Sequence, residues 1–148
     1  MNGFKWSVIR TFGRNLFLFP LWKKTTTLLL KNIQYGIANS QSATVHKEIV
    51  QSATYESGKV TWQISMWFLF RKPPSRVLYE NIRCPVLLIS GTEDKITPIN
   101  IQRSIAKKYR HRAELKVIEG ACHWTIGGSY FPKITETIFT WLNEPRHA

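Results

Sequence analysis

The chain has 148 residues, enough for one domain of ordinary size with a buried core. Hydrophobic residues make up 43% and charged residues 20%, a composition that argues against a disordered or fibrous protein. The formal net charge is +12, yet no run of basic residues is longer than two and no nucleic-acid-binding motif occurs, so we expect no nucleic-acid partner.

An apolar run near the N-terminus, residues 16–22, is interrupted by Pro20 and is too short to span a bilayer. No small-residue cleavage site follows it, so we predict neither a signal peptide nor an integral membrane segment. The two cysteines are too few for a disulfide framework, and their spacing fits no zinc motif. These features predict a cytoplasmic protein without a metal site.

Residues 1–80 predict helices and no clear strand. Apolar residues recur at helical spacing between residues 42 and 53. A second helix is expected to begin after Ser57, a residue type favoured at helix N-caps, and to end before Pro73, because proline cannot continue a helix. Its apolar residues fall almost all round the helix, so we expect it to be buried on more than one side. They are Val60, Trp62, Ile64, Trp67, Phe68 and Leu69.

Residues 81–148 predict an α/β fold. Residues 85–90 and 115–118 are short apolar runs closed by glycine, as expected for buried parallel strands. Helices are predicted over residues 98–109 and 131–142, and the order strand, helix, strand, helix with short links predicts a right-handed parallel crossover. The last helix carries an apolar stripe that we expect to face the core: Ile134, Ile138, Trp141 and Leu142.

Two polar residues follow the predicted strands at the edge of the sheet where ligands bind. Asp94 comes four residues after the end of the first strand, and His123 comes five residues after the end of the second. If the strands are neighbours, their ends lie about 4.8 Å apart, so the carboxylate of Asp94 could reach an imidazole nitrogen of His123. A general base needs this arrangement, because the acid fixes the tautomer of the imidazole and stabilises its charged form.

The cysteines provide a check on the parallel pairing. Cys84 precedes the first strand and Cys122 follows the second, so parallel pairing places them at opposite ends of the sheet, about 15 Å apart. A disulfide requires Cα atoms within about 7 Å of each other. We therefore predict two free thiols.

Two segments carry a family resemblance. Residues 82–98 look like the strand and turn that deliver the acid in α/β-hydrolases, and residues 120–124 resemble the loop that delivers their histidine. The closing helix is similar to the last helix of that family. The resemblance covers roughly residues 80–143 and is fairly specific, because strand, turn and spacing agree.

The resemblance implies roles and a reaction. Asp94 would be the triad acid and His123 the base, whereas Glu93 stands one position before the family's acid. The fold would be the C-terminal part of an α/β-hydrolase parallel sheet, with residues 81–148 as core and residues 1–80 as a helical lid. The implied reaction is hydrolysis of an ester or related acyl bond in a small apolar substrate, with neither metal nor organic cofactor.

The aromatic residues of the expected lid have two interpretations. Trp62, Trp67 and Phe68 would line or cover an apolar substrate pocket, together with Trp124 beside the histidine. Alternatively, each of the lid residues packs the lid against the core.

The sequence departs from the family at the nucleophile. The expected G-x-S-x-G elbow, which precedes the acid in the family, does not occur in these residues. Ser129 is a poor substitute, because it lacks the later glycine and follows the histidine. We therefore expect a truncated or split reading frame, with little turnover by this chain alone. Stable folding is expected to need the missing half, a partner chain or self-association, because two strands leave an edge exposed.

Three alternatives remain open at this stage. The first is a related reaction on the same scaffold, such as epoxide or haloalkane hydrolysis or a perhydrolase activity, and an aspartate at the missing elbow would favour the epoxide or haloalkane versions. A fragment that only binds or interacts would retain the pocket without chemistry. A basic protein that binds nucleic acid or a membrane surface would show steeply salt-dependent retention.

Overall fold

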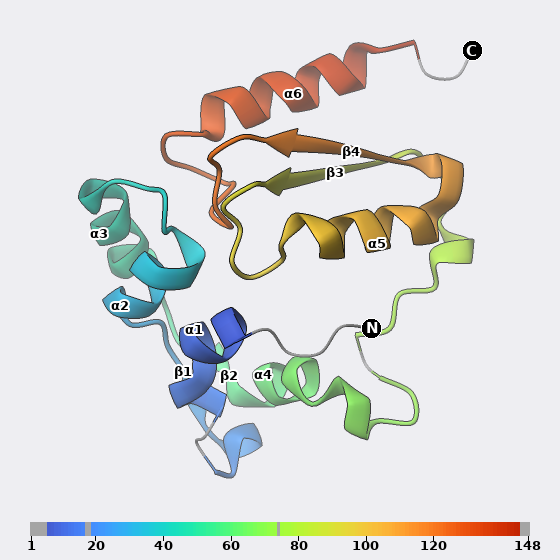
Figure 1. The fold of residues 1–148 in the computed structure, drawn as a ribbon. Coiled ribbons are helices and arrows are strands. Elements are labelled where there is room, and N and C mark those ends of the chain that lie inside the picture. The colour runs from blue at the N-terminus through green and yellow to red at the C-terminus, as the bar shows by residue number, and fades with distance from the viewer. Residues whose placement is uncertain (1–5, 17–18, 74, 146–148) are drawn as a thin grey trace.

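The computed structural model describes residues 6–16, 19–73 and 75–145, without the side chains of Arg14, Leu16 and Phe68. Figure 1 shows two parts. One is a small sheet with a helix on each face, and the other is a group of helices that lies beside one of those two covering helices. Within the described residues, no helix is long and apolar enough to cross a membrane.

The second part is the predicted α/β unit. Strand β3 (Val86–Gly91) pairs in parallel with β4 (Ala113–Ile118), in a register that runs from Val86 opposite Ala113 to Gly91 opposite Ile118. Helix α5 (Ile99–Tyr109) and helix α6 (Phe131–Asn143) cover opposite faces of this sheet (Figure 1). The predicted α/β class and the parallel sheet are therefore confirmed, and β4 begins two residues earlier than expected.

The core of this unit lies between the sheet and α6. Ile118, Ala121 and Ile134 are buried together, and Ile89, Tyr130 and Ile138 pack against them. The prediction that Leu142 faces the core is wrong, since it is 59% exposed. Leu142 lies in the last turn of α6, the end of the helix that diverges from β4 in Figure 1.

Both cysteines are free, as predicted. Cys84 is exposed two residues before β3, whereas Cys122 is buried four residues after β4. The parallel register therefore keeps the two thiols at opposite ends of the sheet.

The first part is mainly helical, and its elements are short. They are α1 (Trp6–Leu16), η1 (Leu21–Lys23), β1 (Thr25–Thr26), α2 (Leu30–Asn32), the π-helical turn η2 (Ile33–Ile37), α3 (Ala43–Ser52), β2 (Glu56–Ser57), α4 (Gly58–Ser65) and η3 (Trp67–Leu69). Further 3-10 turns are η4 (Tyr79–Asn81) and η5 (Arg110–Arg112). The expectation that residues 1–80 contain no strand is wrong, because β1 pairs with β2 in a short antiparallel ladder. Two-residue strands are too short to show an alternating pattern.

A small core holds this helical part together. Ile33, Ile37, Ala38 and Ile49 form a buried cluster. Helix α3 begins at the predicted place because the side chain of Ser42 accepts a hydrogen bond from the backbone N–H of Val45, at 3.3 Å.

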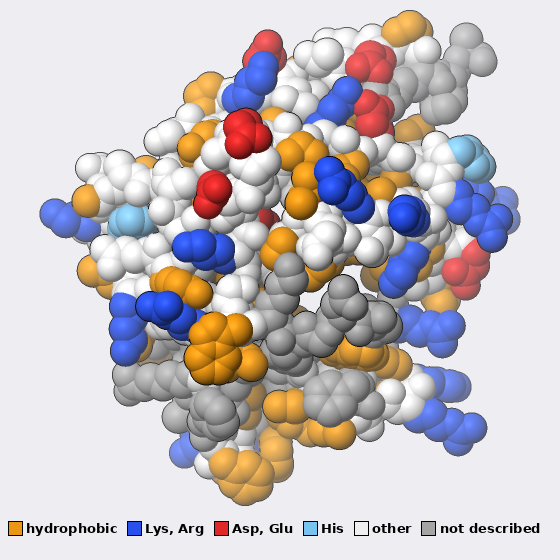
Figure 2. Space-filling model, viewed as in Figure 1, with side chains coloured by type: hydrophobic (Ala, Val, Ile, Leu, Met, Phe, Trp, Pro, Cys, Tyr) orange, Lys and Arg blue, Asp and Glu red, His pale blue; other side chains and the backbone are white. Residues whose placement is uncertain are grey.

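The predicted burial of the second helix on more than one side is wrong. Helix α4 ends at Ser65, and a separate 3-10 turn follows, so the apolar residues do not form one continuous helix. Val60 is 49% exposed, Ile64 58% and Leu69 63%. Helix α4 packs against η1, α1 and the β1–β2 ladder, and these contacts cover one side of it. Figure 2 shows hydrophobic side chains at the surface of the lower part of the molecule, where Figure 1 places η1 and α4.

Candidate functional site

The turn after β3 fixes the carboxylate of Asp94. Its Oδ1 accepts hydrogen bonds from the backbone N–H groups of Ile96 and Thr97, at 2.8 and 2.7 Å, so the side chain closes its own turn. Asp94 is only 8% exposed. Pro98 then stands at the N-cap of α5, where its carbonyl accepts hydrogen bonds from the backbone N–H groups of Ile101 and Gln102.

His123 meets this carboxylate from the loop after β4. Its Nδ1 lies 3.0 Å from Asp94 Oδ2. The hydroxyl of Thr97 donates to the same Oδ2 at 2.8 Å and lies 3.4 Å from His123 Nδ1. The hydrogen bonds of His123 to the described residues all involve Nδ1, and 39% of its side chain is exposed, so Nε2 can face an incoming molecule.

Two opposing effects act on the pKa of Asp94. Burial raises it, because desolvation disfavours the charged carboxylate. The hydrogen bond from His123, the backbone N–H of Thr97, the charge of His123 and the Thr97 hydroxyl all favour the carboxylate and outweigh burial. The pKa of Asp94 is therefore lowered from its usual value of 3.8, and the carboxylate stays ionised at neutral pH.

The two loops are joined where the strands end. The backbone N–H of Thr92 donates to Ile118 O at 3.1 Å, and that of Glu93 donates to Ala121 O at 2.9 Å. Gly91 lies so close to the Ala121 carbonyl that a Cβ at position 91 would overlap its oxygen. These individual contacts join the two loops just beyond the last paired residues and bring Asp94 and His123 together.

The comparison with known families agrees with this arrangement. The sequence model of the alpha/beta hydrolase fold matches residues 6–128, which include the helical part, both strands of the sheet and both members of the pair, and which end before α6. The chain belongs to the α/β-hydrolase family. No curated protein matches it.

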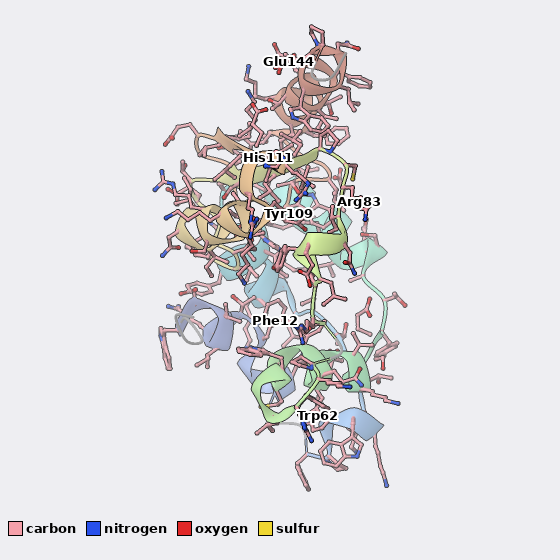
Figure 3. All side chains as sticks on the ribbon, turned by 90° about the vertical axis from the view of Figure 1, so that its right-hand side faces the viewer. Phe12, Trp62, Arg83, Tyr109, His111 and Glu144 are labelled. Atoms are coloured by element: carbon pink, nitrogen blue, oxygen red, sulfur yellow. The ribbon has the colours of Figure 1, made fainter. Side chains whose placement is uncertain are left out.

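The four aromatic residues expected to line the substrate pocket of this α/β-hydrolase do not all lie beside Asp94 and His123. Trp62 packs against Trp22 and Phe70, with ring centroids 5.3 and 5.0 Å apart, and lines a surface hollow of about 290 Å³ with Trp22 and Lys59. Figure 1 places α4 at the end of the molecule away from β3 and β4, and Figure 3 shows Trp62 at the end opposite Glu144, the residue that follows α6.

The other three aromatic residues have different positions. Trp67 lies in η3 and is 36% exposed, and the side chain of Phe68 lies outside the described part of the chain. Trp124 directly follows His123 and packs against the buried cluster of Ile33, Ile37, Ala38 and Ile49. Among the four, the structure places only Trp124 in the loop of the α/β-hydrolase pair.

Thr97 is a further residue of the site that was not predicted from the sequence. Its spacing three residues after Asp94 was a usable signal, because a side chain at that position can close an Asp turn. Ser129, the serine that fits the nucleophile motif poorly, is exposed, and its N–H donates to Gln41 Oε1. Among the described residues, no group of three or more His, Cys, Asp or Glu side chains could hold a metal ion.

Proposed function

We propose that Asp94 and His123 are the acid and the base of a serine-hydrolase triad that acts on an ester or related acyl bond of an apolar substrate. The observation that carries this proposal is the 3.0 Å contact between Asp94 Oδ2 and His123 Nδ1 at the ends of adjacent parallel strands. Membership of the α/β-hydrolase family supports it.

Each residue would have a distinct step. The ionised Asp94 would accept the Nδ1–H of His123 and so hold the tautomer with a free lone pair on Nε2. That nitrogen would take the proton of a serine hydroxyl as the hydroxyl attacks the acyl carbon, and would then return it to the leaving group. Thr97 would keep Asp94 aligned through its hydroxyl.

The nucleophile is part of the proposal. No G-x-S-x-G segment occurs in the 148 residues, so the serine would come from polypeptide outside them, either covalently continuous or in a partner chain. Within the described residues β3 pairs only with β4, so its other edge is open to a further strand. Self-association through that edge is the other way to cover it.

We further propose that residues 1–80 are the lid and residues 81–148 the C-terminal part of the core. Trp124 is the best placed of the proposed pocket residues, whereas Trp62, Trp67 and Phe68 would contribute through a lid that moves or through the hollow beside Lys59. The exposed free thiol of Cys84 supports a reducing, cytoplasmic location.

The flanking coding DNA provides the first test. A strand followed by G-x-S-x-G within about one hydrolase domain's length upstream, in frame or one frameshift away, would support the proposal. The restored polypeptide should hydrolyse p-nitrophenyl esters, and His123→Ala should reduce kcat by at least about 10³-fold. Unchanged kcat in His123→Ala would reject the assignment, and ligand binding without hydrolysis would favour a binding fragment.

A further inference from the structure

Residues 37–41 of the first part lie against both loops that carry the pair. The side-chain amide of Asn39 donates to Glu93 O at 3.1 Å, one residue before Asp94. The backbone N–H of Trp124, one residue after His123, donates to Ile37 O at 2.9 Å. One short segment therefore holds the acid loop and the base loop at positions next to the two reacting groups.

Gln41 makes a third hydrogen bond, to the far end of the loop that carries His123. Its Oε1 accepts the backbone N–H of Ser129 at 2.9 Å, and the residue is only 8% exposed. Gly128 allows this approach, because a Cβ there would overlap the Gln41 amide oxygen and because its φ of 75° favours glycine. The tie joins residues 88 positions apart.

The segment itself is firmly held. Ile37 and Ala38 belong to the buried core of the helical part, at 7% and 0% exposure. Buried His46 hydrogen-bonds the carbonyl of Ala38 through Nε2 at 2.8 Å, and the backbone N–H of Gln41 donates to the same carbonyl at 3.0 Å. The hydrogen bonds to the two loops thus come from a segment that is anchored in the buried core of the helical part.

We propose that Asn39 and Gln41 are positioning residues, which set the distance between the Asp94 loop and the His123 loop from outside the sheet. Register pairing of the strands ends at Gly91 and Ile118, so beyond that point the loops depend on individual hydrogen bonds. A displacement of about 1 Å at a catalytic pair costs on the order of 100-fold in rate, which is why such ties matter. The catalytic meaning of this role rests on the proposed function, but the geometric role does not.

Neutral substitutions of similar volume test the proposal in the full 148-residue chain. Asn39→Leu removes the donor to Glu93 O, and Gln41→Met removes the acceptor for Ser129 N–H, and neither adds a charge. Asn81→Leu and Gln63→Met are controls that make the same changes of residue type at side chains without a hydrogen bond to the described residues; both sites are more exposed than Asn39 and Gln41, respectively. The readouts are the titration of the Asp94 carboxyl carbon by NMR and the melting temperature.

We expect Asn39→Leu and Gln41→Met each to raise the acid titration midpoint of Asp94 by about half a pH unit, a threefold change in its dissociation constant, with no shift in the controls. A melting temperature that falls while the Asp94 midpoint stays fixed would mean a merely structural role and would overturn the proposal. Asn39 is half-buried, so Asn39→Leu still gives an answer if Gln41→Met fails to fold. This result does not depend on turnover, so a failed kinetic test of His123 rejects the triad and leaves the positioning role intact.

Discussion

Helix α6 of the α/β part buries Ile134 against the sheet although its Phe139 and Leu142 are 59% exposed, whereas α4 of the helical part has no fully buried apolar side chain. In the α/β part, Ile134 is 3% exposed and Ile118 7%, because the sheet and α6 cover each other. In the helical part, Ile33 is fully buried, yet Ile64 and Leu69 in α4 and η3 are 58% and 63% exposed. A helix with apolar residues on all sides is therefore not always buried within its own chain. Its exposed apolar side chains form a surface that a partner could cover.

The largest loss of stability is expected at Ile134 of the α/β part, and Ile64 of the helical part is the residue to compare with it. Ile134→Ala should lower the free energy of unfolding by about 2–5 kcal/mol, because it leaves a cavity between α6 and the sheet. Ile64→Ala should change it by less than about 0.5 kcal/mol, because that side chain is mostly exposed. Urea denaturation of both variants measures the difference. Equal losses would mean that α4 is buried in solution, for example by self-association, and size-exclusion chromatography with light scattering would detect it.

Gly91→Ala tests how tightly the strand ends of the α/β part are joined. The added methyl group would overlap the carbonyl oxygen of Ala121, a backbone atom that cannot rotate away. We expect a loss of about 1–3 kcal/mol in the free energy of unfolding, together with a changed NMR signal of His123. A variant as stable as the wild type would contradict the close contact between these loops.

In the helical part, α3 begins with a side-chain cap and α4 begins without one. Ser42→Ala should destabilise the protein by about 1 kcal/mol, because the Ser42 hydroxyl caps α3. Ser57→Ala should have little effect, because the Ser57 side chain makes no capping hydrogen bond at α4. Thermal unfolding of the two variants compares them directly, and a larger effect at Ser57 would show that α4 is capped in solution.

The smallest expected effect is on the pH dependence of stability. Because the folded-state pKa of Asp94 is lowered below 3.8, its contribution is fully present above that value and is lost as pH falls through the folded-state pKa. Asp94→Asn should therefore lose less stability than the wild type between pH 7 and pH 3. Urea denaturation at both pH values measures this, and parallel losses in the two proteins would argue against an ionised, hydrogen-bonded Asp94.

Sequence patterns predicted the α/β part better than the helical part. The two apolar runs and their closing glycines gave the strands to within two residues, and the positions of Asp94 and His123 after those strands predicted their meeting. These features are local, and parallel pairing brings them together. The extra length of β4 comes from the pairing of Ala113 with Val86, and the exposure of Leu142 is a property of the packed molecule that no local pattern encodes.

The remaining features depend on long-range contacts. Asn39 and Gln41 reach residues 54 and 88 positions away, so nothing in their sequence neighbourhood indicates a role at the pair. The position of Trp62 depends on how α4 packs against η1 and the β1–β2 ladder, and composition alone gave no direction for its ring.

The most direct test of the acid–base pair is the tautomer of His123, read from its two ring-nitrogen chemical shifts at about pH 9, where imidazoles are neutral. We expect Nδ1 to carry the proton, because the Asp94 carboxylate accepts it, and Nε2 to be unprotonated and able to act as a base. Asp94→Asn should reduce that preference. A proton on Nε2 in the wild-type protein would leave no base facing a substrate and would contradict the proposed triad.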